Sequence, residues 1–265
     1  MKTRYPKELL YSLGALLGAV IVIHAIWTFW VRPSAQAVLT VQAESMRKDP
    51  NYVPQRSMFV IMKDWEQESC VILMIWALAI IGLKSGSTRR EQELLEGDPV
   101  RVPEGMRILP EDTREYVRQL ESLPGEQQQS LIVRASKAAL ARFGATRNVQ
   151  DVSEAGHAVC AAEAERLDSE LSMLRYIAWA IPAIGFIGTV RGIGDALSQA
   201  HKAVTGDISG VTEGLGVAFN STLVALLLSL VLMFLLHQLQ LAQERLVLDA
   251  ETYLDNRVLR NLQVR

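Results

Sequence analysis

The chain has only two cysteines, little net charge and no set of catalytic side chains. Cys70 lies in an apolar run and Cys160 in a polar one, and no CxxC occurs, so we predict no disulfide framework. The net charge of −2 gives no signature of nucleic-acid binding. Without a Ser/His/Asp set, an HExxH or paired carboxylates in an apolar setting, no enzyme is predicted. His157 and Cys160 lack further ligands nearby, so we predict neither a metal site nor a cofactor.

The chain instead contains several long apolar segments. The composition is 49% hydrophobic and 21% charged, which predicts a membrane protein with a sizeable cytoplasmic part. Four candidate membrane spans lie at about 9–31, 69–83, 173–197 and 215–236. A signal peptide is the alternative for the first, although its apolar run is long for one. A buried core helix is the alternative for the short second run. We predict an all-α membrane protein with four transmembrane helices.

The distribution of basic residues predicts the orientation of these spans. Lysines and arginines precede the first span and follow the second and fourth, which places both termini in the cytoplasm. Basic residues in the connection 32–68 weaken this reading. The predicted plan is an N-terminal transmembrane hairpin (1–83) with an extracytoplasmic loop (32–68), a cytoplasmic helical insertion (84–172), a channel-forming transmembrane pair (173–236) and a cytoplasmic C-terminal helix (237–265).

The predicted cytoplasmic segments have helical patterns. Helices are expected at 111–123, at 126–143 with Gly144 as a C-cap, and at 149–174, where the helix continues into the third span. In the C-terminal helix, Leu239, Leu246 and Tyr253 recur every seven residues. That stripe packs either on a neighbouring subunit or on helices of the same chain, and the sequence leaves both open.

The third span contains a proline and several glycines. Pro182 removes one backbone donor and predicts a helix kink. Gly185, Gly188 and Gly192 predict a surface for close helix packing, with Gly188 and Gly192 forming a GxxxG pair. Thr189 lies between them. Their spacing fits neither a dinucleotide-binding nor a P-loop motif.

The fourth span has polar residues at the corresponding place. Asn220, Ser221 and Thr222 are consecutive, and such side chains are costly against lipid. We therefore expect them to face protein or water. Hydrogen bonding between helices and an ion path both explain them, and the residues alone do not choose between the two.

Three charged residues flank these spans. Arg191 and Asp195 are four residues apart and can pair on a helix. Together with Glu213 they are interpreted as interfacial anchors. No Asp or Glu lies in the middle of a predicted span, so a proton-driven machine would need a carboxylate from a partner.

The sequence PAIGFIGTVRGI, followed by a loop and EGLGVAFNSTLVALLLS, resembles the MotA/TolQ/ExbB proton-channel family over about 174–240. The resemblance implies the channel subunit of an ion-driven motor stator in the bacterial inner membrane. It implies a homopentamer around two copies of a single-span MotB/TolR/ExbD-like protein that supplies an aspartate. By the same resemblance, Pro182 matches the span-three proline, and Thr189 and Thr222 match the channel-lining threonines.

The resemblance also implies that H+ is transported, with Na+ as the alternative because hydroxyls suit both ions. A cytoplasmic effector or rotor is a further implied partner, besides the lipid bilayer. Two other functions stay open from the sequence. One is a non-conducting membrane scaffold; the other is a secondary transporter subunit, for which more spans or inverted repeats are expected.

Overall fold

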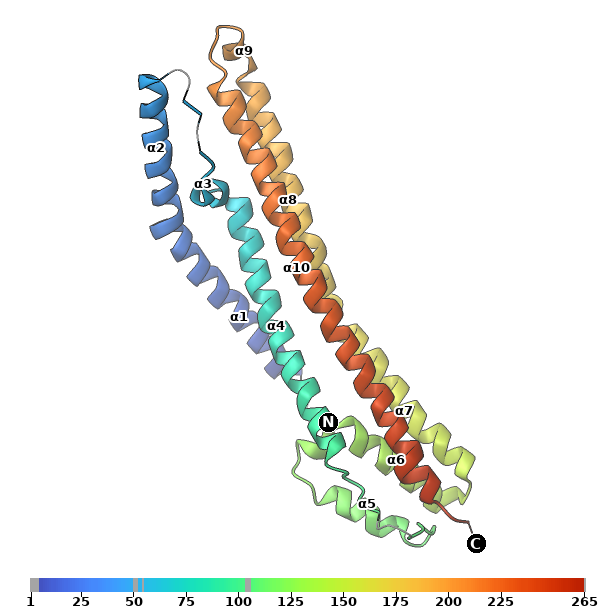
Figure 1. Ribbon diagram of the computed structural model, residues 1–265. Coiled ribbons are helices and arrows are strands. Elements are labelled where there is room, and N and C mark those ends of the chain that lie inside the picture. The colour runs from blue at the N-terminus through green and yellow to red at the C-terminus, as the bar shows by residue number, and fades with distance from the viewer. Residues whose placement is uncertain (1–4, 50–51, 54, 103–105, 265) are drawn as a thin grey trace. The chain divides into compact units, whose positions relative to one another are not determined.

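The computed structural model of the chain describes residues 5–49, 52–53, 55–102 and 106–264. These residues are mostly helical (Figure 1), and among them no strand forms beyond an isolated bridge between Ile108 and Leu262. The α-helices are α1 (Tyr5–Ile26), α2 (Arg32–Lys48), α3 (Met58–Met62), α4 (Trp65–Glu96), α5 (Thr113–Glu121), α6 (Leu131–Thr146), α7 (Val149–Glu170), α8 (Ser172–Ser198), α9 (Ala200–Ala203) and α10 (Ser209–Tyr253). The π-helices η1 (Trp27–Val31) and η3 (Leu254–Val258) and the 3₁₀-helices η2 (Gln127–Gln129) and η4 (Leu259–Asn261) complete the set. The predicted all-α class is confirmed.

Four helical stretches are long and apolar enough to cross a membrane. They are Leu9–Lys48, Trp65–Glu96, Val149–Ser198 and Ser209–Asn261. Large apolar side chains such as Phe186 and Leu230 are exposed on them, as expected for surfaces that face lipid. The predicted number of four candidate spans is confirmed.

The chain divides into two compact units, each with its own core. Unit 1 consists of Met1–Ile81 and Met173–Leu236, and unit 2 of Gly82–Ser172 and His237–Arg265. The boundaries predicted from sequence lie at residues 83, 172 and 236. Each unit is therefore built from two stretches that are far apart in the chain.

The segment after the first span is helical where a loop was predicted. α1, η1 and α2 follow one another without interruption as far as Lys48, and α3 forms further along. Arg32–Lys48 is rich in residues that favour helix, and Pro33 directly follows the π-helical turn η1, a local change of hydrogen bonding that accommodates its missing N–H. The helix ends at Asp49, which precedes a proline in sequence and is extended.

Within unit 1, two tryptophans connect α1–η1 to α3 and to the second span. The Trp27 indole N–H donates to the Met62 carbonyl at 2.8 Å, and the Trp76 indole N–H donates to the Ser12 carbonyl at 2.9 Å. Ile23, Trp27 and Val31 form a small buried cluster. These contacts hold the first two spans together as a hairpin.

The core of unit 2 lies between α6, α7 and the end of α10. Its fully buried side chains include Ile132, Leu140, Phe143, Leu254 and Val258. Of the seven-residue stripe, Leu239 and Leu246 are buried within the single chain, and Tyr253 packs against this core. This burial favours packing on helices of the same chain.

Gly144 does not end its helix, contrary to the sequence prediction. α6 continues to Thr146, and Arg147 adopts the left-handed conformation with φ 52°. A Cβ on Gly144 would lie 2.7 Å from the Thr113 hydroxyl oxygen. The glycine is therefore explained by the close approach of α5, and the helix stops three residues later than predicted.

Candidate ion pathway

α8 and α10 lie side by side in unit 1 (Figure 1) and approach so closely that their contact face requires glycine. A Cβ on Gly192 would lie 2.5 Å from the Ala218 backbone nitrogen, and one on Gly214 would lie 2.6 Å from the Ala196 nitrogen. Cβ atoms on Gly185 and Gly188 would collide with side chains of α10. The structure thus places the predicted glycines at the contact between these two helices.

The hydroxyls of Thr189 and Thr222 meet across this contact. The Thr189 hydroxyl also lies 3.2 Å from the Ala218 carbonyl and 3.3 Å from the Gly185 carbonyl. The Thr222 hydroxyl lies 3.2 Å from the same Gly185 carbonyl. We call Thr189 and Thr222 the threonine pair. The structure brings together these two residues, which are 33 positions apart in the chain.

The threonine pair has fewer protons than hydrogen bonds to make. Two hydroxyl protons serve four contacts, because both threonines reach the Gly185 carbonyl, one reaches the Ala218 carbonyl, and the hydroxyls also contact each other. Two of these four bonds are therefore always unmade. Each hydroxyl oxygen also keeps accepting capacity. Both threonines are half-buried, so a group at the surface of the pair can bind to them. The arrangement can donate to a carboxylate or accept from a carboxylic acid by rotating hydroxyls.

The other two polar residues of the fourth span lie differently. Ser221 is buried against Gly188, and its hydroxyl is 2.9 Å from the Val217 carbonyl of its own helix. It acts in helix packing. Asn220 is half-buried, and among the described residues its amide makes no hydrogen bond. Of the predicted polar cluster, Asn220 is thus available to a group outside the chain.

Pro182 lies inside α8 and leaves the carbonyl one turn before it without its usual donor. That carbonyl belongs to Ala178, which is buried. The Ser229 hydroxyl of α10 donates to it at 3.2 Å. The proline and the serine, 47 positions apart in the sequence, thus form one unit, because the hydroxyl replaces the missing N–H.

The loss of stability on replacing Ser229 by alanine therefore depends on whether residue 182 is proline. Ser229→Ala is expected to lower the free energy of unfolding by about 1–3 kcal/mol, because the buried Ala178 carbonyl loses its donor. In a Pro182→Ala background, the restored backbone N–H of residue 182 binds that carbonyl. Ser229→Ala should then lower the free energy of unfolding by only about a few tenths of a kcal/mol. Denaturant titration of the four proteins in detergent measures both values. Equal costs in the two backgrounds would contradict the assignment.

The three predicted interfacial charges all make ion pairs. Arg191 binds Glu66 through two hydrogen bonds, Nε to Oε1 at 2.6 Å and Nη2 to Oε2 at 2.9 Å. Its guanidinium also lies 3.5 Å from Asp195, the i,i+4 pair that the sequence indicated. Glu213 lies 3.2 Å from the Lys63 ammonium. These residues connect the start of α4 to α8 and α10.

Sequence reasoning missed Glu66, the main partner of Arg191. Its side chain is 0% exposed, although we placed it in a loop. Asp64 lies beside it, 3.6 Å from the Arg191 guanidinium. Burial raises the pKa of the Asp64 carboxyl, while the charges of Lys63 and Arg191 act in the opposite direction.

A signal for Glu66 was present in the length of the second span. The predicted run 69–83 has 15 residues and covers about 22 Å as a helix, short of the hydrocarbon thickness of about 30 Å. A spanning helix must therefore take in neighbouring residues. α4 begins at Trp65, which brings Glu66 and Glu68 into the packed part of unit 1.

A second ionic cluster joins α4 to the first span. Glu68 is buried and accepts a hydrogen bond from the Arg32 guanidinium at 2.6 Å. The other carboxylate oxygen lies 2.6 Å from Nδ1 of His24. His24 is therefore paired within the chain, on the side of α4 that faces α1.

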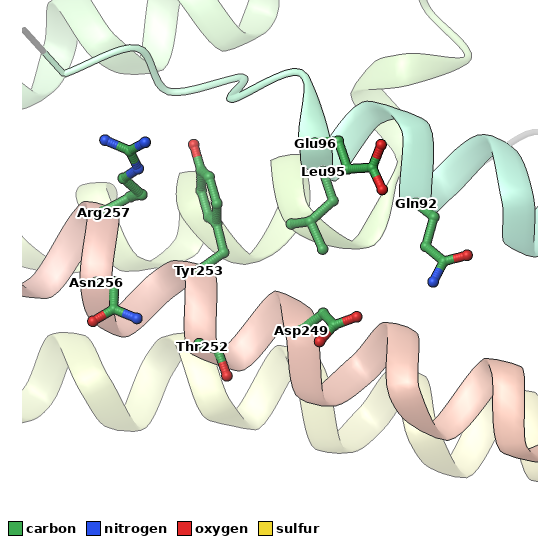
Figure 2. A pocket seen from close by; sticks show the side chains of 8 residues that line it. All are labelled: Gln92, Leu95, Glu96, Asp249, Thr252, Tyr253, Asn256 and Arg257. Carbon is green, nitrogen blue, oxygen red and sulfur yellow. The ribbon is translucent and has the colours of Figure 1, made fainter.

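Unit 2 contains a pocket lined by the end of α4 and by α10 and η3 (Figure 2). The lining residues are Gln92, Leu95, Glu96, Asp249, Thr252, Tyr253, Asn256 and Arg257. The Tyr253 hydroxyl donates to Asp98 at 2.6 Å, and the Arg257 guanidinium lies 3.9 Å from the same carboxylate. These contacts hold the segment that follows α4, and none of the predicted site residues lies in this pocket.

Across the residues that the structure describes, no group of three or more His, Cys, Asp or Glu side chains could hold a metal ion. His157 lies near Glu251 and Asp255, at 3.7 and 3.5 Å. Cys160 is buried as a free thiol.

In a comparison against protein families, residues 127–252 match the model of one family. That family is the MotA/TolQ/ExbB proton channel family, to which this part of the chain is similar. The predicted recognition is confirmed, and the match covers every predicted site residue from Pro182 to Thr222. The MotA/TolQ/ExbB family is a channel family and not a family of enzymes. Neither the curated proteins nor the solved structures contain a significant match to the chain.

Proposed function

We propose that this chain is the channel subunit of an ion-motive-force-driven membrane motor. It lies in the inner membrane of a bacterium with both termini in the cytoplasm. The MotA/TolQ/ExbB domain and the four apolar helices support this function. The observation that carries it is the threonine pair, two hydroxyls in contact within the glycine-lined contact between α8 and α10.

The proposed path runs along the interface between a ring of five copies and the helix of a single-span partner, present in two copies. A proton crosses the membrane by protonating an aspartate of that partner next to Thr189 and Thr222. The hydroxyls donate to the charged carboxylate and accept from the neutral acid, so both states are stabilised. The change in charge alters which subunit the partner helix prefers, and the ring steps around it.

The ion is H+ in this proposal, with Na+ as the alternative. Hydroxyl and carbonyl oxygens can replace part of the hydration shell of Na+, and the threonine pair provides both kinds of oxygen. The cytoplasmic unit 2 would transmit the motion to an effector or rotor.

Native mass spectrometry of the complex, purified from its own host with neighbouring genes intact, tests the assembly. Five copies of this chain with two copies of a small single-span protein are expected. A ring without a second protein would favour a non-conducting scaffold. A monomer or dimer would contradict the proposed assembly.

A further inference from the structure

The Glu66 side chain lies in a groove that exists because α8 has no side chain at Gly188. A Cβ on Gly188 would lie 3.1 Å from the Glu66 Cγ and would also collide with Ser221. Gly188 and Ser221 are the immediate neighbours of Thr189 and Thr222 in the chain. The Glu66 side chain therefore packs against α8 at the residue before Thr189, beside Ser221 of α10.

Glu66 and Arg191 differ in the number of their ion-pair partners. Glu66 is 0% exposed, and Arg191 is its ion-pair partner among the described residues. Arg191 has further partners, because Asp64 and Asp195 lie 3.6 and 3.5 Å from its guanidinium. Loss of Arg191 thus leaves a buried carboxylate unpaired, whereas loss of the Glu66 charge leaves Arg191 with two other acids.

We propose that Glu66 and Arg191 are positioning residues for the threonine pair. Their two parallel hydrogen bonds join α4 to α8, and the Glu66 side chain also lies at Gly188 beside Ser221 of α10, so the pair fixes how α8 sits against α10 where the two threonine hydroxyls meet. A bidentate pair fixes direction as well as distance, which a single contact does not. Glu66 lies outside the family-matched residues 127–252, so the family match assigns it no role. The inference rests on the proposed function for what the threonine pair does.

The geometry of the threonine pair can be measured without any transport. Thr189→Cys and Thr222→Cys are combined in the full-length chain, with Cys70 and Cys160 replaced by alanine. Because the hydroxyls are in contact, the two thiols should form a disulfide rapidly on mild oxidation in membranes. The rate of this disulfide formation reports the register of α8 and α10.

Glu66→Gln is expected to slow disulfide formation by about tenfold, since a misplacement of about 1 Å can cost reacting groups about 100-fold and losing one charge while keeping the side-chain shape should shift the helices by less. Arg191→Met should slow it more, because the buried Glu66 charge then lacks its partner. The double variant Glu66→Gln, Arg191→Met should recover part of the rate, because no unpaired charge is left. A double variant worse than either single one would contradict a role through charge pairing.

Glu68→Gln is the matched control. Glu68 is also a buried acid of α4 with an arginine partner, but Arg32 and His24 hold it on the side of α1. This variant should leave the disulfide rate as in the parent. If Glu66→Gln behaves like Glu68→Gln, the positioning role is wrong.

H+ flux into liposomes with the co-purified partner, measured without the added cysteines, separates this inference from the proposed function. Flux should fall in parallel with the disulfide rate for Glu66→Gln. If Thr222→Val leaves flux unchanged, the proposed function is wrong. The disulfide rates still test the positioning role of Glu66 and Arg191 in that case. Should Thr222→Val abolish flux while Glu66→Gln changes neither readout, only the positioning fails.

Discussion

Gly192→Ala will lower the free energy of unfolding of the chain in detergent by about 3 kcal/mol or more, because overpacking a close helix contact cannot relax cheaply. The added Cβ would lie 2.5 Å from two backbone atoms of α10, the Ala218 nitrogen and the Gly214 oxygen. Backbone atoms cannot rotate away, so the two helices must separate. Denaturant titration measures the loss of stability.

Gly194 provides the control for this substitution. It lies two residues further along α8, and a Cβ there would have nothing within 4 Å in the chain. Gly194→Ala should be neutral or stabilising by up to about 1 kcal/mol, because alanine favours helix over glycine. The same chemical change is therefore expected to have opposite signs at two neighbouring positions. Similar losses of stability for Gly192→Ala and Gly194→Ala would contradict the close contact described between α8 and α10.

Thr222→Val is expected to reduce H+ flux through the reconstituted complex by about 10- to 100-fold, the equivalent of one hydrogen bond to a charged group. The substitution keeps the shape and removes the hydroxyl. Folding should be affected less, because Thr189 remains 3.3 Å from the Gly185 carbonyl that Thr222 also binds. The measurement is dye-reported acidification of liposomes that contain the chain and its co-purified partner.

Thr222→Ser separates the hydroxyl from the methyl group. It retains the donor and should keep flux within a few-fold of the parent. Loss of flux in both variants would indicate a packing role for the methyl group, and full flux in Thr222→Val would exclude the hydroxyl from the path.

Sequence patterns predicted the features of unit 1 that depend on residue type alone. Apolar length predicted four candidate spans, and glycines at i, i+3 and i+7 predicted the close face that α8 presents to α10. Proline chemistry explains why Ser229 is needed, since the carbonyl that Pro182 leaves free is fixed by position. These predictions succeed because helix rise, glycine spacing and the missing proline N–H follow from backbone geometry alone.

Features that depend on contacts between distant segments could not be predicted in this way. The partner of Arg191 is Glu66, 125 positions earlier, and neither residue indicates the other in sequence. Gly144 follows the pattern of a C-cap, but a helix from elsewhere in the chain determines its role. The helix α2 was missed because the segment was read by its charges and not by its helix-forming composition.

The most direct test of the account is H+ flux through the unmodified complex in liposomes under an imposed potential. We expect acidification of the lumen that depends on the potential and on the presence of the single-span partner. Liposomes that stay impermeable to both H+ and Na+, although they contain the complete complex, would contradict an ion path along the threonine pair.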